Sequence, residues 1–384
     1  MPILLGRSDR GLLARWWFTV DRGLMFAVLL LMASGVLVSM AASPPVAERI
    51  GADTFHFIKS QLLYLALAVP VLVTLSFFPP RYARRAGLLV FFAALGLMVA
   101  ALFFGPEIKG AHRWINIGPI NLQPSEFAKP AFVIVAAWFL AEHTRRPEMP
   151  GQVIALLFAA AFIGLLIMQP DFGQTALVIL TFGSMLLIYG ISWFTVLGLG
   201  ALGTAGVFAA YELVDHVRSR IDRFMSPDKG DTFQVDTALQ AFKNGGLMGT
   251  GPGGGEAKLV LPDAHTDFTF AVVGEEFGLI ACVLLMSLFA FVVLKILMRA
   301  KQEPDPFAAL ALSGLGLIFG FQAVINMGVN VALLPAKGMT LPFISYGGSS
   351  LLGMAFGMGL VLALGRKRFG VRSSVPELNV SYAR

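Results

Sequence analysis

Long, mostly apolar runs recur along the chain, and they restrict its fold more than any other feature of the sequence. A helix needs roughly 17 to 25 such residues to cross the hydrocarbon core of a bilayer, because each residue advances the helix by about 1.5 Å. Runs of about this length lie at 23–43, 61–78, 86–104, 125–141, 153–168, 172–189, 194–212, 268–297, 307–333 and 347–365. We therefore predict an all-α polytopic membrane protein with ten transmembrane helices.

Composition supports the membrane class. The 384 residues are 57% hydrophobic and 14% charged, whereas soluble domains average about half apolar and a quarter charged. No repeat or separate soluble domain is visible, so residues 1–384 are expected to form one membrane domain. The short connections at 169–173 and 190–193 leave open a merged or re-entrant pair of helices, which would change the count by two. The single cysteine, Cys282, excludes a disulfide within the chain.

Basic residues mark alternate connections and predict the orientation. The positive-inside rule assigns the side that carries most Lys and Arg to the cytoplasm. This places residues 1–22 and the tail 366–384 in the cytoplasm, with the first apolar run as an uncleaved anchor. Residues 213–267, which carry more acidic than basic side chains, become a large extracytoplasmic loop between the seventh and eighth helices. The net charge of +6 is then explained by topology, and nucleic-acid binding is not indicated.

The first outward connection, residues 105–126, mixes aromatic and basic side chains. Trp114 beside Arg113 is typical of a segment at the lipid headgroups, where Arg113 would anchor to a lipid phosphate. Glu126 and Lys129 are three residues apart at the start of a membrane helix and so share a face. An ion pair inside a membrane is costly, which makes the two residues functional candidates, with a helix-packing pair as the alternative.

The loop at 213–267 carries two further signals. Arg218 and Arg223 offer donors suited to phosphate oxygens. The glycine-rich stretch 245–255 permits close backbone approach to a ligand, or forms a plain flexible loop. It does not match the Gly-x-x-x-x-Gly-Lys-Ser/Thr phosphate loop, so no ATP site is indicated.

Asp267 stands where this loop becomes an apolar helix, next to His265. Thr266 or Asp267 would serve as a helix cap, a role that contributes about 1 kcal/mol. The alternative is a carboxylate that faces an outward cavity and accepts a proton from a hydroxyl nucleophile. At 3.6 residues per turn, Glu275 lies about 80° from Asp267 and Glu276 about 180°. We therefore expect Glu275 to line the same cavity, and Glu276 to point away into a buried pair.

The third outward connection, 334–350, is too apolar for an open loop and too rich in Pro and Gly for a helix. It predicts a broken or re-entrant element before the tenth helix. Such backbone persists at membrane depth only when it is buried in protein or lines a polar cavity. Lys337 and Ser345 are expected to reach into that cavity, with snorkelling to the interface as the alternative for Lys337.

Five motifs together resemble the SEDS family of shape, elongation, division and sporulation proteins. In chain order they are Gly-Ala-His-Arg-Trp-Ile (110–115), Gln-Pro-Ser-Glu-Phe-Ala-Lys (123–129), Ala-His-Thr-Asp-Phe (264–268), Gly-Glu-Glu-Phe-Gly (274–278) and Leu-Pro-Phe-Ile-Ser-Tyr-Gly-Gly-Ser-Ser (341–350). The lysine at 337 resembles the division branch of the family more than the elongation branch, which is the second choice. Two departures are the extra glycines at 251–255 and Asp263, where the family often has glutamate.

The resemblance implies an inverting peptidoglycan glycosyltransferase that polymerises lipid II on the outer face of the bacterial inner membrane, at the division septum. It implies that Asp267 is the general base for the acceptor hydroxyl and that a lipid pyrophosphate leaves. Positioned cations would then offset the charge that develops on the leaving group. The candidates for substrate binding are Lys337, Arg113, Ser345, Lys129, Glu126, His265, Arg218 and Arg223.

No cofactor is required by the sequence. A divalent cation, Mg or Mn, would suit the pyrophosphate, but no residues have recognisable metal-ligand spacing. The implied partners are lipid II, the growing glycan strand, a class B penicillin-binding protein with transpeptidase activity, other divisome proteins and membrane lipids. Two other functions fit the same residues: a transporter that flips lipid II, and a divisome scaffold without catalytic activity.

Overall fold

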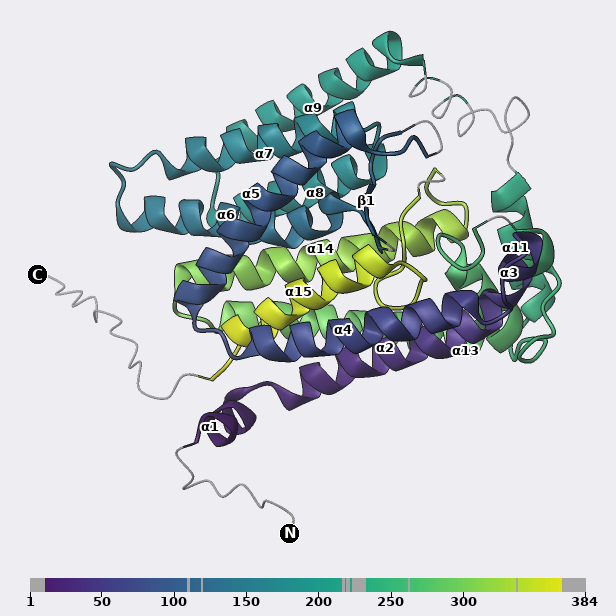
Figure 1. Ribbon diagram of the computed structural model, residues 1–384. Helices are drawn as coiled ribbons and strands as arrows, with labels where there is room; N and C mark the ends of the chain where they lie inside the picture. The colour runs from purple at the N-terminus through teal and green to yellow at the C-terminus, as the bar shows by residue number, and fades with distance from the viewer. Residues whose placement is uncertain are drawn as a thin grey trace, which may run out of the picture.

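The computed structural model describes residues 11–108, 111–118, 120–215, 218, 222, 233–261, 263–335 and 338–367, and it is mostly helical (Figure 1). The long helices are α2 (Arg22–Ala42), α4 (His56–Ser76), α5 (Pro80–Phe104), α6 (Pro124–Arg145), α7 (Gly151–Met168), α8 (Phe172–Tyr189), α9 (Trp193–Leu213), α13 (Thr269–Lys301), α14 (Pro306–Asn330) and α15 (Gly348–Leu364). Shorter elements are α1 (Leu12–Thr19), α3 (Pro44–Arg49), α11 (Phe233–Gly245), α12 (Ala257–Val260), β1 (Ile115–Ile117) and β2 (Ile120–Leu122).

Each predicted apolar run coincides with one of these long helices. In the described part of the chain, eight helices (α2, α4, α5, α6, α7, α8, α13 and α14) are long and apolar enough to cross a membrane. The helix α15 is apolar but has only 17 residues. The helices α7, α8 and α9 are separate, so neither short junction conceals a merged helix. Gly190 ends α8 with a left-handed φ of 97°. The chain is an integral membrane protein.

The centre of the bundle is formed by α6, α14 and α15. In the most apolar stretch of α6, 83% of residues are buried within the protein, against 28% in α5 and α7. Small residues allow the central helices to approach closely. A Cβ on Gly353 of α15 would lie 2.5 Å from the carbonyl oxygen of Glu126 on α6. Polar side chains on these helices are therefore shielded from lipid by the outer helices.

The helix α13 is interrupted at Gly278, where φ is 77° and ψ is −179°. Residues 245–251, which we call the glycine segment, fill the interruption. The Thr250 and Gly251 amides donate to the carbonyls of Glu275 and Glu276 at 2.9 and 3.0 Å. On the other side of the break, the amides of residues 279 and 280 donate to the carbonyls of residues 246 and 247. The backbone groups released by the break are thus paired, as a membrane-buried helix requires.

The structure is mostly helical, as the all-α class predicts, but the connection at 105–126 contains a hairpin that the sequence did not predict. Residues 115–117 and 120–122 form a two-stranded antiparallel hairpin, with Ile115 opposite Leu122. Alternating β-branched and polar residues on both sides of Gly118, whose φ is 60°, favour this arrangement. The hydroxyl of Ser349 at the start of α15 joins the hairpin to the bundle, accepting from the Gln123 amide at 3.0 Å and donating to the Asn121 carbonyl at 3.1 Å.

The prediction of a broken element between α14 and α15 is confirmed. The described residues 331–335 and 338–347 form turns and extended backbone, and Met339, Leu341 and Ile344 are buried. Phe343 has a left-handed φ of 64°, and a Cβ on Gly35 of α2 would lie 2.0 Å from its carbonyl oxygen. We call residues 338–347 the broken segment.

Candidate active site

Asp267 lies two residues before the start of α13, and hydrogen bonds from several residues hold its main chain. Its amide donates to the Asp263 carbonyl at 3.0 Å, closing a compact turn in which Asp263 adopts a left-handed φ of 55°. Its carbonyl accepts from the side-chain amides of Asn326 and Asn330 on α14, both at 2.9 Å. One helix distant in sequence and the local turn at Asp263 therefore fix the position of this residue.

The sequence left helix capping by Thr266 or Asp267 open. The N-cap residue of α13 is Phe268, whose side chain makes no capping hydrogen bond. Instead, the Ala271 amide donates to the side-chain oxygen of Asn330 at 3.0 Å, so α14 supplies the cap. The half-buried Asp267 carboxylate faces the broken segment, since its Oδ2 lies 3.4 Å from where a Cβ on Gly338 would be.

Asn326 ties the two sides of this site together. Its side-chain nitrogen donates both to the Asp267 carbonyl at 2.9 Å and to the Met339 carbonyl at 2.6 Å. Asn326 and Met339 are both buried. One amide thus fixes the spacing between the Asp267 turn and the broken segment. Lys337 precedes the broken segment and lies outside the described residues.

His265 and Ser345 are both buried close to Asp267. The His265 ring packs against the rings of Phe57 and Tyr346, with centroids 4.5 and 5.5 Å away, and its carbonyl accepts from the Tyr346 amide at 2.8 Å. The Ser345 hydroxyl accepts from the Leu341 amide at 2.9 Å and donates to the Thr269 hydroxyl at 3.1 Å. Ser345 therefore joins the broken segment to the start of α13, and its contact with substrate stays a prediction.

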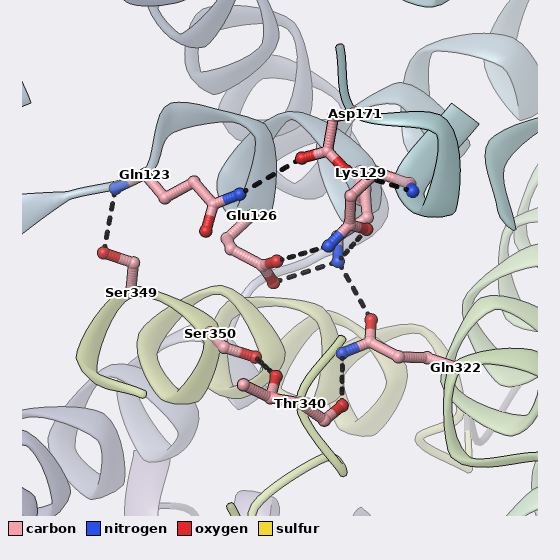
Figure 2. Close-up of polar contacts among 9 residues, drawn as sticks. Gln123, Glu126, Lys129, Asp171, Gln322, Thr340, Ser349 and Ser350 are labelled. Carbon is pink, nitrogen blue, oxygen red and sulfur yellow. Dashed lines mark hydrogen bonds and ion pairs between the residues drawn. The ribbon is translucent and has the colours of Figure 1, made fainter. Parts of the chain in front are cut away.

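The predicted pairing of Glu126 with Lys129 is confirmed, and both side chains are buried (Figure 2). The Lys129 ammonium lies 3.0 Å from a Glu126 carboxylate oxygen. It also donates to the side-chain oxygens of Gln174 and Gln322 at 2.8 and 2.9 Å. Gln174 in turn donates to Glu126 at 2.9 Å. This buried network joins α6, α8 and α14, as a helix-packing pair would, and its contact with substrate stays a prediction.

The buried network reaches the broken segment through Gln322. The Gln322 side chain accepts from Lys129 and donates to the Thr340 carbonyl at 3.1 Å, and Thr340 shares a hydrogen bond with Ser350 of α15 at 2.7 Å (Figure 2). The Asp267 turn and the buried network therefore meet at the same short stretch of backbone. Ion pair, asparagine contacts and broken segment form one connected polar structure.

Arg113 is placed against the junction between α7 and α8. Its guanidinium donates to the carbonyls of Gln169 and Pro170 at 2.9 and 2.6 Å, and it lies 3.7 Å from the Asp171 carboxylate. A cation suits the C-terminal end of a helix, because unpaired carbonyls gather there. Burial raises the pKa of Asp171, and the nearby Arg113 charge opposes that shift. The contacts observed hold this junction, and contact of Arg113 with a phosphate stays a prediction.

Glu275 does not line a cavity with Asp267 as expected. Its carboxylate accepts from the amides of Glu256 and Ala257 at 3.1 and 3.0 Å and from Asn244 at 3.2 Å. Glu275 precedes the break of α13 at Gly278, so the break does not explain this result. The loop amides at the start of α12 bind the carboxylate and hold it in the protein interior. Glu276 forms a buried ion pair with Lys258 of α12, so the prediction of a buried pair is confirmed, although its partner belongs to the loop.

The glycine-rich stretch packs against α13 and does not form an open ligand-binding surface. A Cβ on Gly249, whose φ is 82°, would lie 2.2 Å from the Glu276 carbonyl oxygen, and one on Gly278 would lie 2.4 Å from the Gly249 nitrogen. Close approach between two segments of the chain requires these glycines. Arg218 pairs with Glu212 at 3.1 Å on an exposed surface, and Arg223 lies outside the described residues.

Several polar residues of this site, Gln174 among them, were not identified from the sequence. Three of them, Gln322, Asn326 and Asn330, recur every four residues along α14 and so share one helix face. That spacing was the available signal. Lys258 gave no comparable signal, because its partner Glu276 is set by tertiary packing. Within the described residues, no group of three or more His, Cys, Asp or Glu side chains could hold a metal ion.

Known proteins of one family are similar to this chain. Residues 22–369 match the model of the FtsW/RodA/SpoVE family, described as cell cycle proteins. The chain is 43% identical over 378 residues, 98% of this chain and 97% of its relative, to "Probable peptidoglycan glycosyltransferase FtsW" of Caulobacter vibrioides. It is 36% identical to the protein of the same description from Shewanella sediminis, covering 91% of this chain and 87% of that one.

Two solved structures have similar folds. One is described as "Structural coordination of polymerization and crosslinking by a peptidoglycan synthase complex", with a TM-score of 0.76, 30% identity, and coverage of 91% of this chain and 98% of that one. The other is the crystal structure of the Thermus thermophilus rod shape determining protein RodA, with a TM-score of 0.66, 28% identity, and coverage of 91% and 97%. The family model spans nearly the whole chain, including both sides of the Asp267 site, and this protein belongs to the FtsW/RodA/SpoVE family of cell cycle proteins.

Proposed function

We propose that this chain is a peptidoglycan glycosyltransferase that polymerises lipid II into glycan strands during cell division, with Asp267 as its general base. The observation that carries the proposal is the fixed position of Asp267, whose carboxylate faces the broken segment while α14 holds both backbones. Relatives that bear the name of this activity match the chain over nearly its full length. The lysine at 337 favours the division branch represented by FtsW.

The chemistry requires one base and a stabilised leaving group. The Asp267 carboxylate accepts the proton of the C4 hydroxyl of the incoming sugar while that oxygen bonds to the anomeric carbon of the donor. The bond from that carbon to the lipid pyrophosphate breaks, and the configuration inverts. Negative charge develops on the pyrophosphate, where a cation lowers the barrier. Lys337, one residue before Gly338, is the proposed cation.

A carboxylate fixed beforehand has an advantage over a mobile one. The Asn326 and Asn330 contacts orient the Asp267 main chain before substrate arrives, so little reorganisation is needed during the reaction. Ser345 and the buried network support the broken segment from the other side. In this proposal they act as positioning residues, because their polar atoms bind protein groups.

The proposed setting is the bacterial inner membrane at the division septum. Ten membrane spans, with both termini in the cytoplasm, put the Asp267 end of the bundle on the outer face, where lipid II is consumed. A class B penicillin-binding protein, similar to FtsI, is the proposed transpeptidase partner. The similarity to a chain from a peptidoglycan synthase complex supports this pairing. Other divisome proteins are proposed as activators.

Purified protein with its transpeptidase partner, incubated with lipid II in detergent, tests the reaction. Glycan polymer resolved on a gel is expected from the wild-type protein and at least about 1,000-fold less from Asp267→Asn, because the amide cannot accept the proton. Asp263→Asn is the matched control, since asparagine also tolerates the left-handed φ of that residue.

The alternatives give different results. A transporter would yield no polymer in detergent under any activating condition and would move lipid II across vesicle membranes, which would reject the enzyme. A scaffold would let Asp267→Asn support cell division. Equal unfolding temperatures of the two variants are required, so that loss of polymer reports chemistry rather than folding.

A further inference from the structure

A polar cavity lies at the end of the bundle opposite to Asp267. Its volume is about 370 Å³, within the range of roughly 300 to 1,000 Å³ typical of small-ligand sites. The junction of α1 and α2, the last turns of α13 and the chain after α15 form its walls. It is lined by Phe18, Thr19, Val20, Asp21, Arg22, Gly23, Lys295, Arg299, Gly365 and Lys367.

The cavity is strongly basic, because four of its side chains are cationic and one is anionic. Two of the cations are already occupied by protein groups. Lys295 pairs with Asp21 at 2.9 Å, and Arg299 pairs with Glu303 at 2.9 Å while donating to the Gly365 carbonyl at 2.8 Å. These contacts hold the walls of the cavity in place.

The other two cations, Arg22 and Lys367, are not neutralised by a described protein group. Across the parts of the chain that the structure describes, no hydrogen bond or ion pair engages the side chains of Arg22 or Lys367, both exposed. Arg22 only stacks over the Trp17 ring at 5.5 Å. The Lys367 main chain is fixed by its amide, which donates to the Thr19 carbonyl at 3.0 Å. Two uncompensated cations on fixed backbone therefore border one cavity.

The surroundings place this cavity at the level of lipid headgroups. The short helix α1 precedes α2 at the same end of the bundle (Figure 1) and exposes Leu12 and Leu13, 80% and 63% accessible. The Trp16 ring nitrogen donates to the Ser76 hydroxyl at 2.7 Å, at the last residue of α4. Amphipathic helices with Trp side chains are typical of the membrane interface.

We propose that this cavity binds the phosphate of an anionic phospholipid, with Arg22 and Lys367 as the direct contacts and Lys295 and Arg299 as the supporting charge. Basic pockets between helices at the cytoplasmic surface suit such headgroups. An adjoining void lined by Leu24, Ile296 and Leu312 has a volume of only about 10 Å³, so the acyl chains stay in the bilayer. The bound lipid would join α1, α2, α13 and the end of α15.

This site is separate from the proposed glycosyl transfer. Lys295 lies 28 residues after Asp267, near the far end of α13. The proposal does not depend on the reaction, and either one can fail alone.

Native mass spectrometry of the purified full-length protein in detergent tests the site, by titration with phosphatidylglycerol and, separately, with phosphatidylcholine. The variant is Arg22→Gln combined with Lys367→Gln. The matched control is Arg81→Gln combined with Arg85→Gln, which removes two cations from the start of α5, where their guanidinium groups stack over Tyr82 outside the cavity. We expect the variant to bind the first phosphatidylglycerol roughly 30-fold more weakly than the wild type, and the control to stay within about threefold.

Three results would overturn the proposal. They are equal loss in variant and control, equal binding of both lipids by the wild type, and displacement of the lipid by inorganic phosphate at matching affinity, which would indicate a site for soluble anions. Because both changed residues are exposed, the variant is expected to fold, and its unfolding temperature checks this. Polymer formation from lipid II, measured in parallel, separates this test from that of the proposed function.

Discussion

Asp267 is positioned by side-chain amides that the chain supplies more than fifty residues later. Asn326 and Asn330 bind its carbonyl, and Asn330 also caps the helix that follows. The Asp267 carboxylate faces the broken segment. At the scale of one residue, the division of tasks is clear: α14 provides structural support, and Asp267 provides the reactive group of the proposed mechanism.

Replacement of Asn330 by alanine tests this division. The change leaves the Ala271 amide without its buried side-chain partner, a loss that costs about 1–3 kcal/mol, and it removes one of the two side-chain donors to the Asp267 carbonyl. We expect a lower unfolding temperature and slower polymerisation of lipid II. Ser313→Ala on the same helix is the control, because its hydroxyl bonds only to the Ala309 carbonyl of its own helix. Wild-type stability and wild-type activity of Asn330→Ala would contradict the assignment.

The partners of some side chains could be predicted from the sequence, and those of others could not. The pairing of Glu126 with Lys129 could be predicted, because a spacing of three residues places side chains on one face of any helix. The partners of Glu275 and Arg113 could not be predicted. Glu275 binds loop amides at the start of α12, and Arg113 binds carbonyls more than fifty residues later, so only packing brings these groups together.

The break in α13 is the most informative feature at the scale of elements. A continuous membrane helix would pair its own amides and carbonyls, but the break at Gly278 leaves several unpaired, and the glycine segment supplies the missing partners. The loop before Asp267 thus packs into the break of the helix that begins just after this residue.

Gly249→Ala is predicted to open this contact. The new Cβ would lie 2.2 Å from the Glu276 carbonyl oxygen, on a residue whose φ of 82° already disfavours alanine. We expect a loss of about 1–3 kcal/mol in the free energy of unfolding. The measurement is thermal unfolding in detergent. Gly183→Ala in α8 has no atom within 4 Å of the added Cβ and is expected to be neutral or slightly stabilising. A Gly249→Ala protein as stable as Gly183→Ala would disprove the role of the glycine segment.

Elements were predictable where one local property dominates. Hydropathy located the long helices of the described chain, because crossing a membrane requires an apolar length that is visible in the sequence. The hairpin of β1 and β2 was missed, since two three-residue strands are too short for a pattern to stand out. The break at Gly278 was missed as well, because one glycine within an apolar run more often marks close helix packing.

At the scale of the whole molecule, the bundle has two chemically different ends. One end holds Asp267 and the broken segment, and the other holds the basic cavity. Orientation in the membrane therefore decides which chemistry meets which compartment. The positive-inside distribution of Arg and Lys predicts that the basic end faces the cytoplasm.

Cysteine labelling in intact cells tests this orientation. In a Cys282→Ala background, which removes the only native cysteine, Met248→Cys and Leu12→Cys introduce thiols at exposed positions on the two ends. After the outer membrane is permeabilised, a maleimide that cannot cross the inner membrane should label Met248→Cys and not Leu12→Cys. After lysis, both should react. The reverse pattern would invert the topology and exclude polymerisation at the outer face.

The sequence by itself determined the membrane class, the positions of the long helices, the broken element before α15 and the shared face of Glu126 and Lys129. Each of these follows from hydropathy or spacing, which are local properties of the chain. Tertiary structure alone decided that Asn330 of α14 binds the first turn of α13, that the glycine segment fills the break at Gly278, and that Glu276 pairs with Lys258. The physical reason is that buried polar groups must find partners, and which partners are within reach is settled only when the helices pack.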